Sequence, residues 1–149
     1  MSSIIEFDAK HWDLFESRGI EQKLFDLDPG AKHKITCLAK YGVGGTLMHD
    51  GRILAFIGYI EIAPGVLEVW SFPSKYVDKY PIIYLKNCKE WVERIEHTTP
   101  NLHRLHLVTK TDAVHVRWAQ FLGFTCESGA IKHYFADKSD AQIWGKVYV

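Results

Sequence analysis

Residues 109–124 carry the sequence TKTDAVHVRWAQFLGF, in which an extended end, a polar turn and a short helix follow one another. Asp112 is suited to cap this helix because its carboxylate can accept backbone N–H groups of the first turn. Gly123 is suited to end it because glycine adopts the left-handed conformation that follows many helices. The stretch therefore predicts a strand over residues 102–109 and a helix over residues 112–122.

A longer amphipathic pattern precedes this strand, from Pro81 to about residue 96. Apolar positions that include Cys88 and Trp91 recur on one helical stripe, and charged positions recur on the other. Pro81 suits a first helical turn, where its missing N–H is not needed. We expect a helix here, with Cys88 as a core thiol.

Three extended runs lie further upstream, at residues 43–49, 52–62 and 66–72. Asp50-Gly51 and Pro64-Gly65 separate them, and Asp-Gly is a strong hairpin signal because it accepts positive φ. The runs predict an antiparallel meander. Its middle strand is apolar on both alternating faces, so we expect both faces to be covered.

The ends of the chain add two helices and two strands. Asp8 can cap a helix that Gly19 ends, and a second helix is expected between residues 29 and 41. Residues 125–135 and 141–148 have strand patterns. This order of helices and strands predicts an α+β fold, and the length predicts one domain over residues 1–149.

The charge balance bears on possible partners. The chain has 18 Lys and Arg against 18 Asp and Glu. Binding to nucleic acid or to a membrane surface draws on an excess of positive charge, so we expect neither partner. Three cysteines without a C-x-x-C pair, and no secretory signal, predict reduced thiols and a cytoplasmic location.

The order of elements and the stretch at 109–124 resemble the GNAT fold of acyl-CoA N-acyltransferases. In that family a strand, a polar turn and a short helix ending in aromatic residues and Gly-Phe follow in this way, here with Trp118 and Gly123-Phe124. The chain is most similar to the acetyltransferase-like internal virion protein A family of short-tailed bacteriophages. The similarity includes an aromatic C-terminal region: Tyr134, Phe135, Trp144 and Tyr148.

The resemblance implies a mixed, mostly antiparallel sheet flanked by helices, with the fourth and fifth strands splayed apart. It implies that the exposed backbone of the fourth strand binds the pantetheine arm of acetyl-CoA, and that backbone N–H groups of the following turn hold the pyrophosphate. The cofactor-binding positions implied in this sequence are Val69, Ser71, Lys75, Tyr76, Lys79 and Asp112.

Two regions depart from the family pattern. Tyr76 stands where Arg or Gln is usual, and Val77, Lys79 and Pro81 stand where glycines or small residues are usual. Ala119 stands where the family often has a tyrosine that protonates the leaving thiolate, and alanine cannot donate a proton.

Glu68, on the fourth strand, is the candidate general base for an incoming amine, and a solvated glutamate is the alternative. Lys75 and Lys79 are either phosphate ligands or surface lysines. His115 is either catalytic or a half-buried histidine bonded to a carbonyl or water. His103 and His106 are three residues apart in a predicted strand, hence on opposite faces, and do not predict a metal site.

The leading hypothesis is therefore a phage N-acetyltransferase that acetylates a small-molecule or protein amine. We expect the acceptor between the N-terminal helices and the last strands, drawn by acidic residues: Glu16, Glu21, Asp26 and Asp28. A second hypothesis is a non-enzymatic protein that kept the fold and serves virion assembly, and a third is a factor that acts on a host protein. The aromatic content leaves room for a homodimer.

Overall fold

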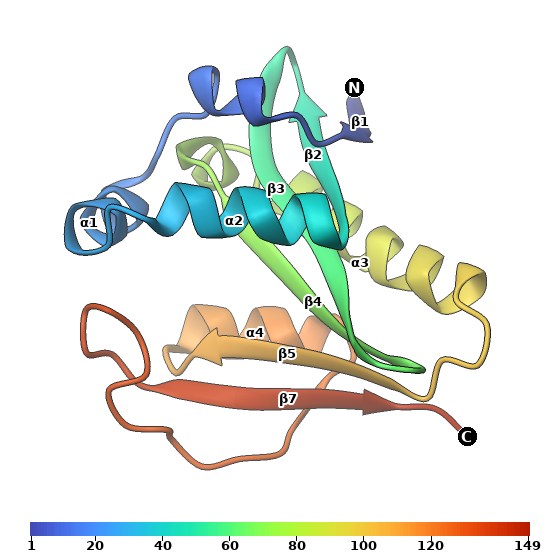
Figure 1. The fold of residues 1–149 in the computed structure, drawn as a ribbon. Helices are drawn as coiled ribbons and strands as arrows, with labels where there is room; N and C mark the ends of the chain where they lie inside the picture. Colours follow the sequence, from blue (N-terminus) through green and yellow to red (C-terminus); the bar gives the residue numbers. More distant parts are fainter. The chain divides into compact units, whose positions relative to one another are not determined.

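The computed structural model describes residues 1–149 and contains seven strands in one sheet, in the order β1-β2-β3-β4-β5-β7-β6 (Figure 1). The pair β4 and β5 is parallel, and the sheet is otherwise mostly antiparallel. This is the predicted α+β fold. The elements in chain order are β1 (Ser2–Glu6), η1 (Ala9–Asp13), α1 (Gly19–Leu27), α2 (Ala31–Tyr41), β2 (Val43–His49), β3 (Arg52–Ala63), β4 (Val66–Pro73), η2 (Lys75–Asp78), α3 (Pro81–Thr98), β5 (Arg104–Lys110), α4 (Ala113–Phe121), β6 (Thr125–Cys126) and β7 (Ala141–Val147).

Contacts between residues divide the chain into two compact units. The first contains Met1–Ile60 and Trp70–Asn87, and the second contains Glu61–Val69 and Cys88–Val149. The chain passes from one unit to the other within β3, β4 and α3. The organisation of residues 1–149 as a single domain stays a prediction.

The first unit is built on the predicted hairpin of β2 and β3. Asp50 and Gly51 turn it, both with positive φ, at 53° and 72°. The middle of β3 is covered on both faces, as predicted, since all residues from Ile53 to Ile57 are at most 1% exposed. Phe56 contacts an aromatic cluster whose other members are Phe7, Trp12, Phe15, Phe25 and Phe72.

The second unit is built on β5, which pairs with β4 on one side and with β7 on the other. Leu105, Leu107 and Thr109 alternate along β5 and are buried, whereas the residues between them are half-buried. Helix α4 packs against β5 (Figure 1). Cys88 is buried, as expected for a core thiol.

The N-terminal helices differ from the prediction. Asp8 does cap a helix, but η1 is a short 3-10 helix that ends at Asp13. Gly19 does not end this helix and instead begins α1, where Arg18 and Glu21 form an ion pair of 2.5 Å that stabilises the first turn.

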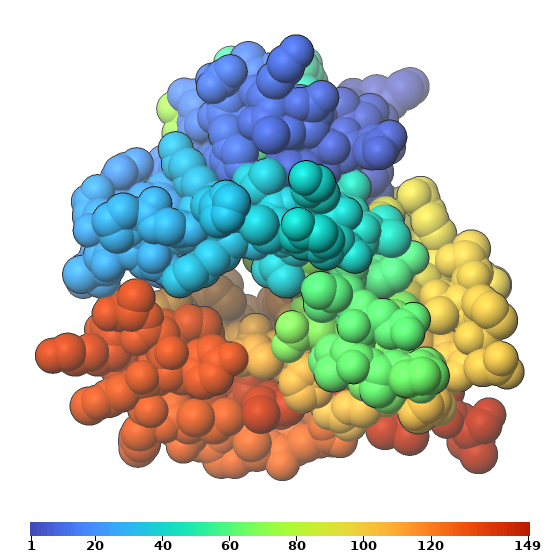
Figure 2. All heavy atoms as spheres, viewed as in Figure 1, coloured from blue at the N-terminus to red at the C-terminus, as the bar shows by residue number.

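The strand predicted at residues 125–135 was also wrong in length, because β6 contains only Thr125 and Cys126. The residues after it form a surface loop, drawn in orange and red in Figure 2. His133 has positive φ, at 52°, which a regular strand does not accommodate. A single antiparallel bridge joins Ile131 to Ala141 within this segment.

Candidate functional site

The parallel ladder between β4 and β5 is short. It joins Val66, Leu67 and Glu68 to Arg104, Leu105 and His106, and it ends at the pair Glu68–His106. Both strands continue beyond this pair, β4 to Pro73 and β5 to Lys110. The backbone of β4 from Val69 onward is therefore not occupied by the β5 ladder, which agrees with the predicted splay of the fourth and fifth strands.

Glu68 has charged and polar neighbours on its own sheet face. Nε2 of His106 lies 3.9 Å from Oε1 of Glu68, and both side chains are partly shielded, at 20% and 34% exposed. Nη2 of Arg104 lies 2.9 Å from Nδ1 of the same imidazole. The predicted base thus lies at one end of a row of interacting side chains.

Glu127 lies at the other end of this row. It accepts two hydrogen bonds from Arg104, at 3.0 Å from Nη1 and 2.5 Å from Nη2. The hydrogen bonds between the two groups raise the pKa of Arg104 and lower the pKa of Glu127. Because the pair is bidentate, it fixes the plane of the guanidinium as well as its position. We call Glu68, His106, Arg104 and Glu127 the β4–β5 polar row.

Gly145 of β7 provides the space for this row. It pairs with His106 on one side and with Thr125 on the other. A Cβ atom at Gly145 would lie 2.7 Å from Nη1 of Arg104 and would also overlap the Glu127 carboxylate. A side chain at position 145 would therefore displace the Arg104–Glu127 pair from the position it has over β7.

Two of the predicted cofactor positions, Val69 and Ser71, follow Glu68 on β4. Val69 is buried, so only its backbone can meet a ligand. The Ser71 hydroxyl lies 2.6 Å from the Tyr84 hydroxyl of α3 and is engaged there. These residues can therefore offer backbone groups to an extended ligand, as a further strand would.

The turn predicted to hold a pyrophosphate is the 3-10 helix η2, which Ser74 caps. Most of its backbone donors are already used within the protein. The acceptors are the Glu16 carbonyl for Lys75, the Ser74 hydroxyl for Tyr76, the Ser74 carbonyl for Val77, and the Tyr76 carbonyl for Lys79 and Tyr80. Pro81 has no N–H, so the first donors of α3 that lack an intrahelical partner are those of Ile82 and Ile83.

The side chains of this turn are also engaged. The Lys75 ammonium lies 2.8 Å from Oε1 of Glu16, and the Tyr76 hydroxyl donates to Oε2 of the same carboxylate. The hydrogen bond with Glu16 raises the pKa of Lys75, and the bonds from Lys75 and Tyr76 lower the pKa of Glu16. Lys79 is exposed and lies over the Tyr80 ring, which leaves its ammonium open to an anion.

Acetyl-CoA therefore fits this chain in part. The backbone of β4 suits the thioester arm, whereas η2 has little to offer a pyrophosphate beyond Lys79 and the start of α3.

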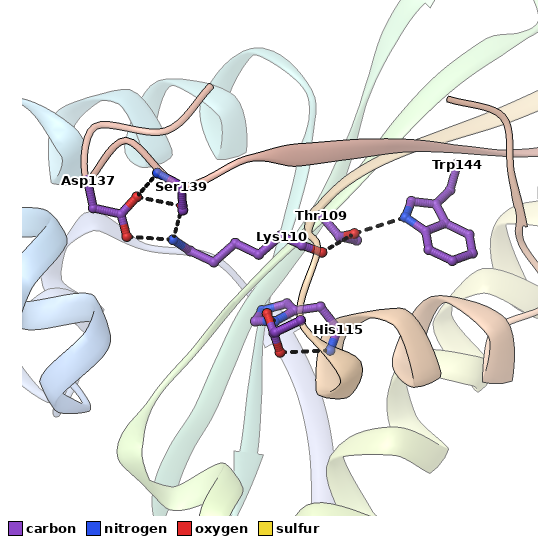
Figure 3. Close-up of polar contacts among 7 residues, drawn as sticks. Thr109, Lys110, His115, Asp137, Ser139 and Trp144 are labelled. Carbon is purple, nitrogen blue, oxygen red and sulfur yellow. Dashed lines mark hydrogen bonds and ion pairs between the residues drawn. The ribbon is translucent and has the colours of Figure 1, made fainter. Parts of the chain in front are cut away.

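The far end of β5 holds a second group of polar contacts (Figure 3). Nζ of Lys110 donates to Asp137 at 2.8 Å and to Ser139 at 2.7 Å, which ties the loop before β7 to the end of β5. Asp112 caps α4 and also accepts a hydrogen bond of 2.6 Å from Nδ1 of His115. Burial acts to raise the pKa of Asp112, but the charge of His115 and its hydrogen bonds to Asp112 together lower that pKa below its ordinary value.

Three further features concern the predicted leaving-group position, metal ligands and membrane spans. Ala119 is fully buried, so its position belongs to the core. No group of three or more His, Cys, Asp and Glu residues could hold a metal ion, and β5 begins only after His103. Every helix is too short or too polar to span a lipid bilayer.

The four carboxylates expected to attract an amine are mostly neutralised by neighbours in the first unit. The partners are Lys75 for Glu16, Arg18 for Glu21, Lys34 for Asp28 and the Gln22 amide for Asp26.

Sequence reasoning missed three members of the β4–β5 polar row. Arg104 and His106 are two residues apart in a strand, so their common face was predictable. The contact of Glu127 with Arg104 was not predictable, because the two residues come together only when β7 pairs with both β5 and β6.

No protein-family model and no curated protein matches the sequence, but solved structures match the fold closely. An IAA acetyltransferase from Bacillus cereus has a TM-score of 0.70 at 15% identity and covers 99% of this chain and 100% of its own. A GNAT-family acetyltransferase from Bacillus anthracis has a TM-score of 0.72 at 12% identity, and the match covers 98% of this chain and 94% of that protein. The ribosomal-protein-S18-alanine N-acetyltransferase from Escherichia coli has a TM-score of 0.70 at 13% identity, and the match covers 99% of this chain and 94% of that protein. The chain therefore has the GNAT fold.

Proposed function

We propose that this protein is an N-acetyltransferase that moves an acetyl group from acetyl-CoA to an amine, with Glu68 as the general base. One observation carries the proposal. Glu68 occupies the last pair of the β4–β5 ladder, beside His106, at the point where the backbone of Val69 leaves that ladder. The likeness of the fold to acetyltransferases supports the same reaction.

The chemistry needs one proton acceptor and one site that polarises a carbonyl. Acetyl-CoA supplies the acetyl group as a reactive thioester. The amine nitrogen forms a bond to the carbonyl carbon, Glu68 takes a proton from that nitrogen, and the sulfur leaves with the C–S bonding pair and is protonated by solvent. Backbone N–H groups near Val69 and Ser71 hold the arm of the donor and polarise its carbonyl.

A second candidate function follows from the segment after β4. Most backbone donors of η2 are used within the protein, Lys75 is neutralised by Glu16, and Ala119 is buried. These features favour a GNAT-fold protein that has lost the cofactor and acts in virion assembly or on a host factor. For either function we propose a short-tailed phage as the source and the host cytoplasm or the virion as the location, on the basis of the aromatic C-terminal pattern.

Binding of acetyl-CoA separates the two functions. A ligand that binds only the folded protein stabilises it by about 2.7 kcal/mol at 100 times its dissociation constant. We expect calorimetric binding and a raised melting temperature for the wild type. Lys79→Met should weaken binding, whereas Lys23→Met, an exposed lysine of α1, should not. No binding at millimolar acetyl-CoA would overturn the enzyme assignment and leave the assembly role.

Transfer to a panel of amines tests the base. Glu68→Gln should leave acetyl-CoA binding unchanged and lower kcat by about 100- to 10,000-fold, the range for loss of a general base. Glu90→Gln, an exposed glutamate of α3, is the matched control. Equal kcat for wild type and Glu68→Gln would remove Glu68 from the reaction.

A further inference from the structure

The β4–β5 polar row specifies which nitrogen of His106 carries a proton. Nη2 of Arg104 lies 2.9 Å from Nδ1 of His106. A guanidinium has only donors, so Nδ1 must be the acceptor in this contact. A neutral imidazole with a bare Nδ1 carries its hydrogen on Nε2. That nitrogen lies 3.9 Å from the Glu68 carboxylate, with the hydrogen available to it.

Two features hold Arg104 in this position. Glu127 binds its guanidinium through two hydrogen bonds, and the Arg104 side chain is 25% exposed. Gly145 leaves the space in which the pair lies across β7. Arg104 therefore has little freedom to turn away and release Nδ1.

We infer that Arg104, held by Glu127, fixes His106 in the Nε2–H tautomer, and that His106 is a positioning residue which orients the Glu68 carboxylate. This inference rests on the proposed function, in which Glu68 is the base. His106 presents its N–H to one carboxylate oxygen, directly after a small side-chain rotation or through one water molecule. The other oxygen of Glu68 is left for the proton of the amine.

The same geometry excludes the reverse division of roles. For His106 to be the base with Glu68 as its orienting group, Nδ1 or Nε2 would need a free lone pair beside the substrate. Nδ1 is occupied by Arg104, and the hydrogen on Nε2 removes the lone pair from that nitrogen. His115 shows the contrasting arrangement, since its Nδ1 faces a carboxylate, Asp112, and not a cation.

Imidazole nitrogen NMR tests the tautomer without any activity. Long-range ¹H–¹⁵N spectra at pH 8.5 should show a pyrrole-like Nε2 and a pyridine-like Nδ1 for His106 in the wild type. Arg104→Met should add the Nδ1–H tautomer of His106. Glu127→Gln should add it to a smaller extent, and this variant keeps the test available if Arg104→Met folds poorly. His97→Gln, which alters an exposed histidine of α3, should leave the His106 signals unchanged. A wild-type Nδ1–H tautomer would overturn the inference.

Kinetics test the positioning role. Glutamine can place an amide N–H near the site of Nε2, so His106→Gln should keep kcat within about threefold of the wild type. His106→Ala should lower kcat by about 10- to 100-fold, since misplaced catalytic groups cost rates of this order, with KM for acetyl-CoA unchanged. Wild-type kcat in His106→Ala, or an equal loss in both variants, would overturn the role. No transfer by the wild type would refute the proposed function, whereas the NMR result would still decide the tautomer.

Discussion

The hydrogen bond between Trp144 and Thr109 should be a measurable part of the stability of the second unit. Nε1 of Trp144 donates to Oγ1 of Thr109 at 2.9 Å (Figure 3). The two residues are only 2% and 4% exposed, so no bulk water can replace a lost partner. Thr109→Val keeps the shape of the side chain and removes the acceptor, which leaves a buried indole N–H unpaired.

The expected cost is about 1–3 kcal/mol, the range for a buried donor that loses its partner. For a chain of about 150 residues, each kcal/mol corresponds to a shift of about 2–4 °C in Tm. Urea unfolding followed by circular dichroism measures the free energy of unfolding. If Thr109→Val unfolds with the same free energy as the wild type, within about 0.5 kcal/mol, the hydrogen bond does not contribute as the structure indicates.

A double-mutant cycle separates the hydrogen bond from packing. Trp144→Phe removes the donor and also leaves a cavity, so its own cost contains both effects. In the Thr109→Val background the hydrogen bond is already absent, and Trp144→Phe should cost about 1 kcal/mol less than in the wild type. Equal costs in the two backgrounds would refute the reasoning.

Three further predictions concern stability, each measured by urea unfolding. Gly65→Ala should destabilise by more than about 1 kcal/mol, because φ is +79° and a Cβ would lie 2.6 Å from the Asn101 carbonyl; Gly129→Ala, with nothing within 4 Å, is the control and should be neutral. Phe56→Ala should cost about 3–5 kcal/mol because the ring is fully buried in the aromatic cluster, and a loss below 1 kcal/mol would contradict that packing. Hydrogen bonds from Lys110 and Ser139 lower the pKa of Asp137 below its ordinary 3.8, so this carboxylate stabilises the fold above about pH 4 and the contribution is lost as the pH falls through the lower folded value. Asp137→Asn should therefore destabilise at pH 7 and differ less from the wild type below pH 4, and a constant difference at both pH values would count against the ion pair.

The two candidate functions differ in what they require of the segment after β4. An acetyltransferase needs the backbone of β4 and some cation or donor for the phosphates of the cofactor. In the proposed function, Lys79 and the first turn of α3 provide these groups. The comparison of Lys79→Met with Lys23→Met is therefore the most direct measure of how far the cofactor site persists.

Local chemistry was sufficient to predict most of the elements. Asp50-Gly51 specifies a tight hairpin because both residues accept positive φ, and the hairpin of β2 and β3 formed where expected. The Asp112 carboxylate accepts a backbone N–H at the start of α4, and Gly123 ends the helical segment with a φ of 91°. The predicted strand at 102–109 is shifted to Arg104–Lys110, a small difference at its ends.

Errors arose where the local pattern was compatible with more than one structure. Gly19 is compatible with either end of a helix, and the ion pair of Arg18 with Glu21 favours a beginning. Residues 125–135 were predicted as one strand, but His133 has positive φ and its N–H donates to the Asp140 carboxylate, so the chain turns there instead of continuing as a strand.

The sequence by itself determined the class of fold and placed Glu68 on the fourth strand, because hydrophobic periodicity and turn residues act over a few positions. Only the tertiary structure decided what surrounds that carboxylate. Arg104 and His106 share a face of β5, but they meet Glu68 only once β4 and β5 have paired. Glu127, which follows β6, reaches Arg104 only once β5, β7 and β6 have paired, and Gly145 leaves space for that contact only in this register. The same holds for η2, because most of its backbone N–H groups find acceptors on Glu16, Ser74 and Tyr76 only in the folded protein.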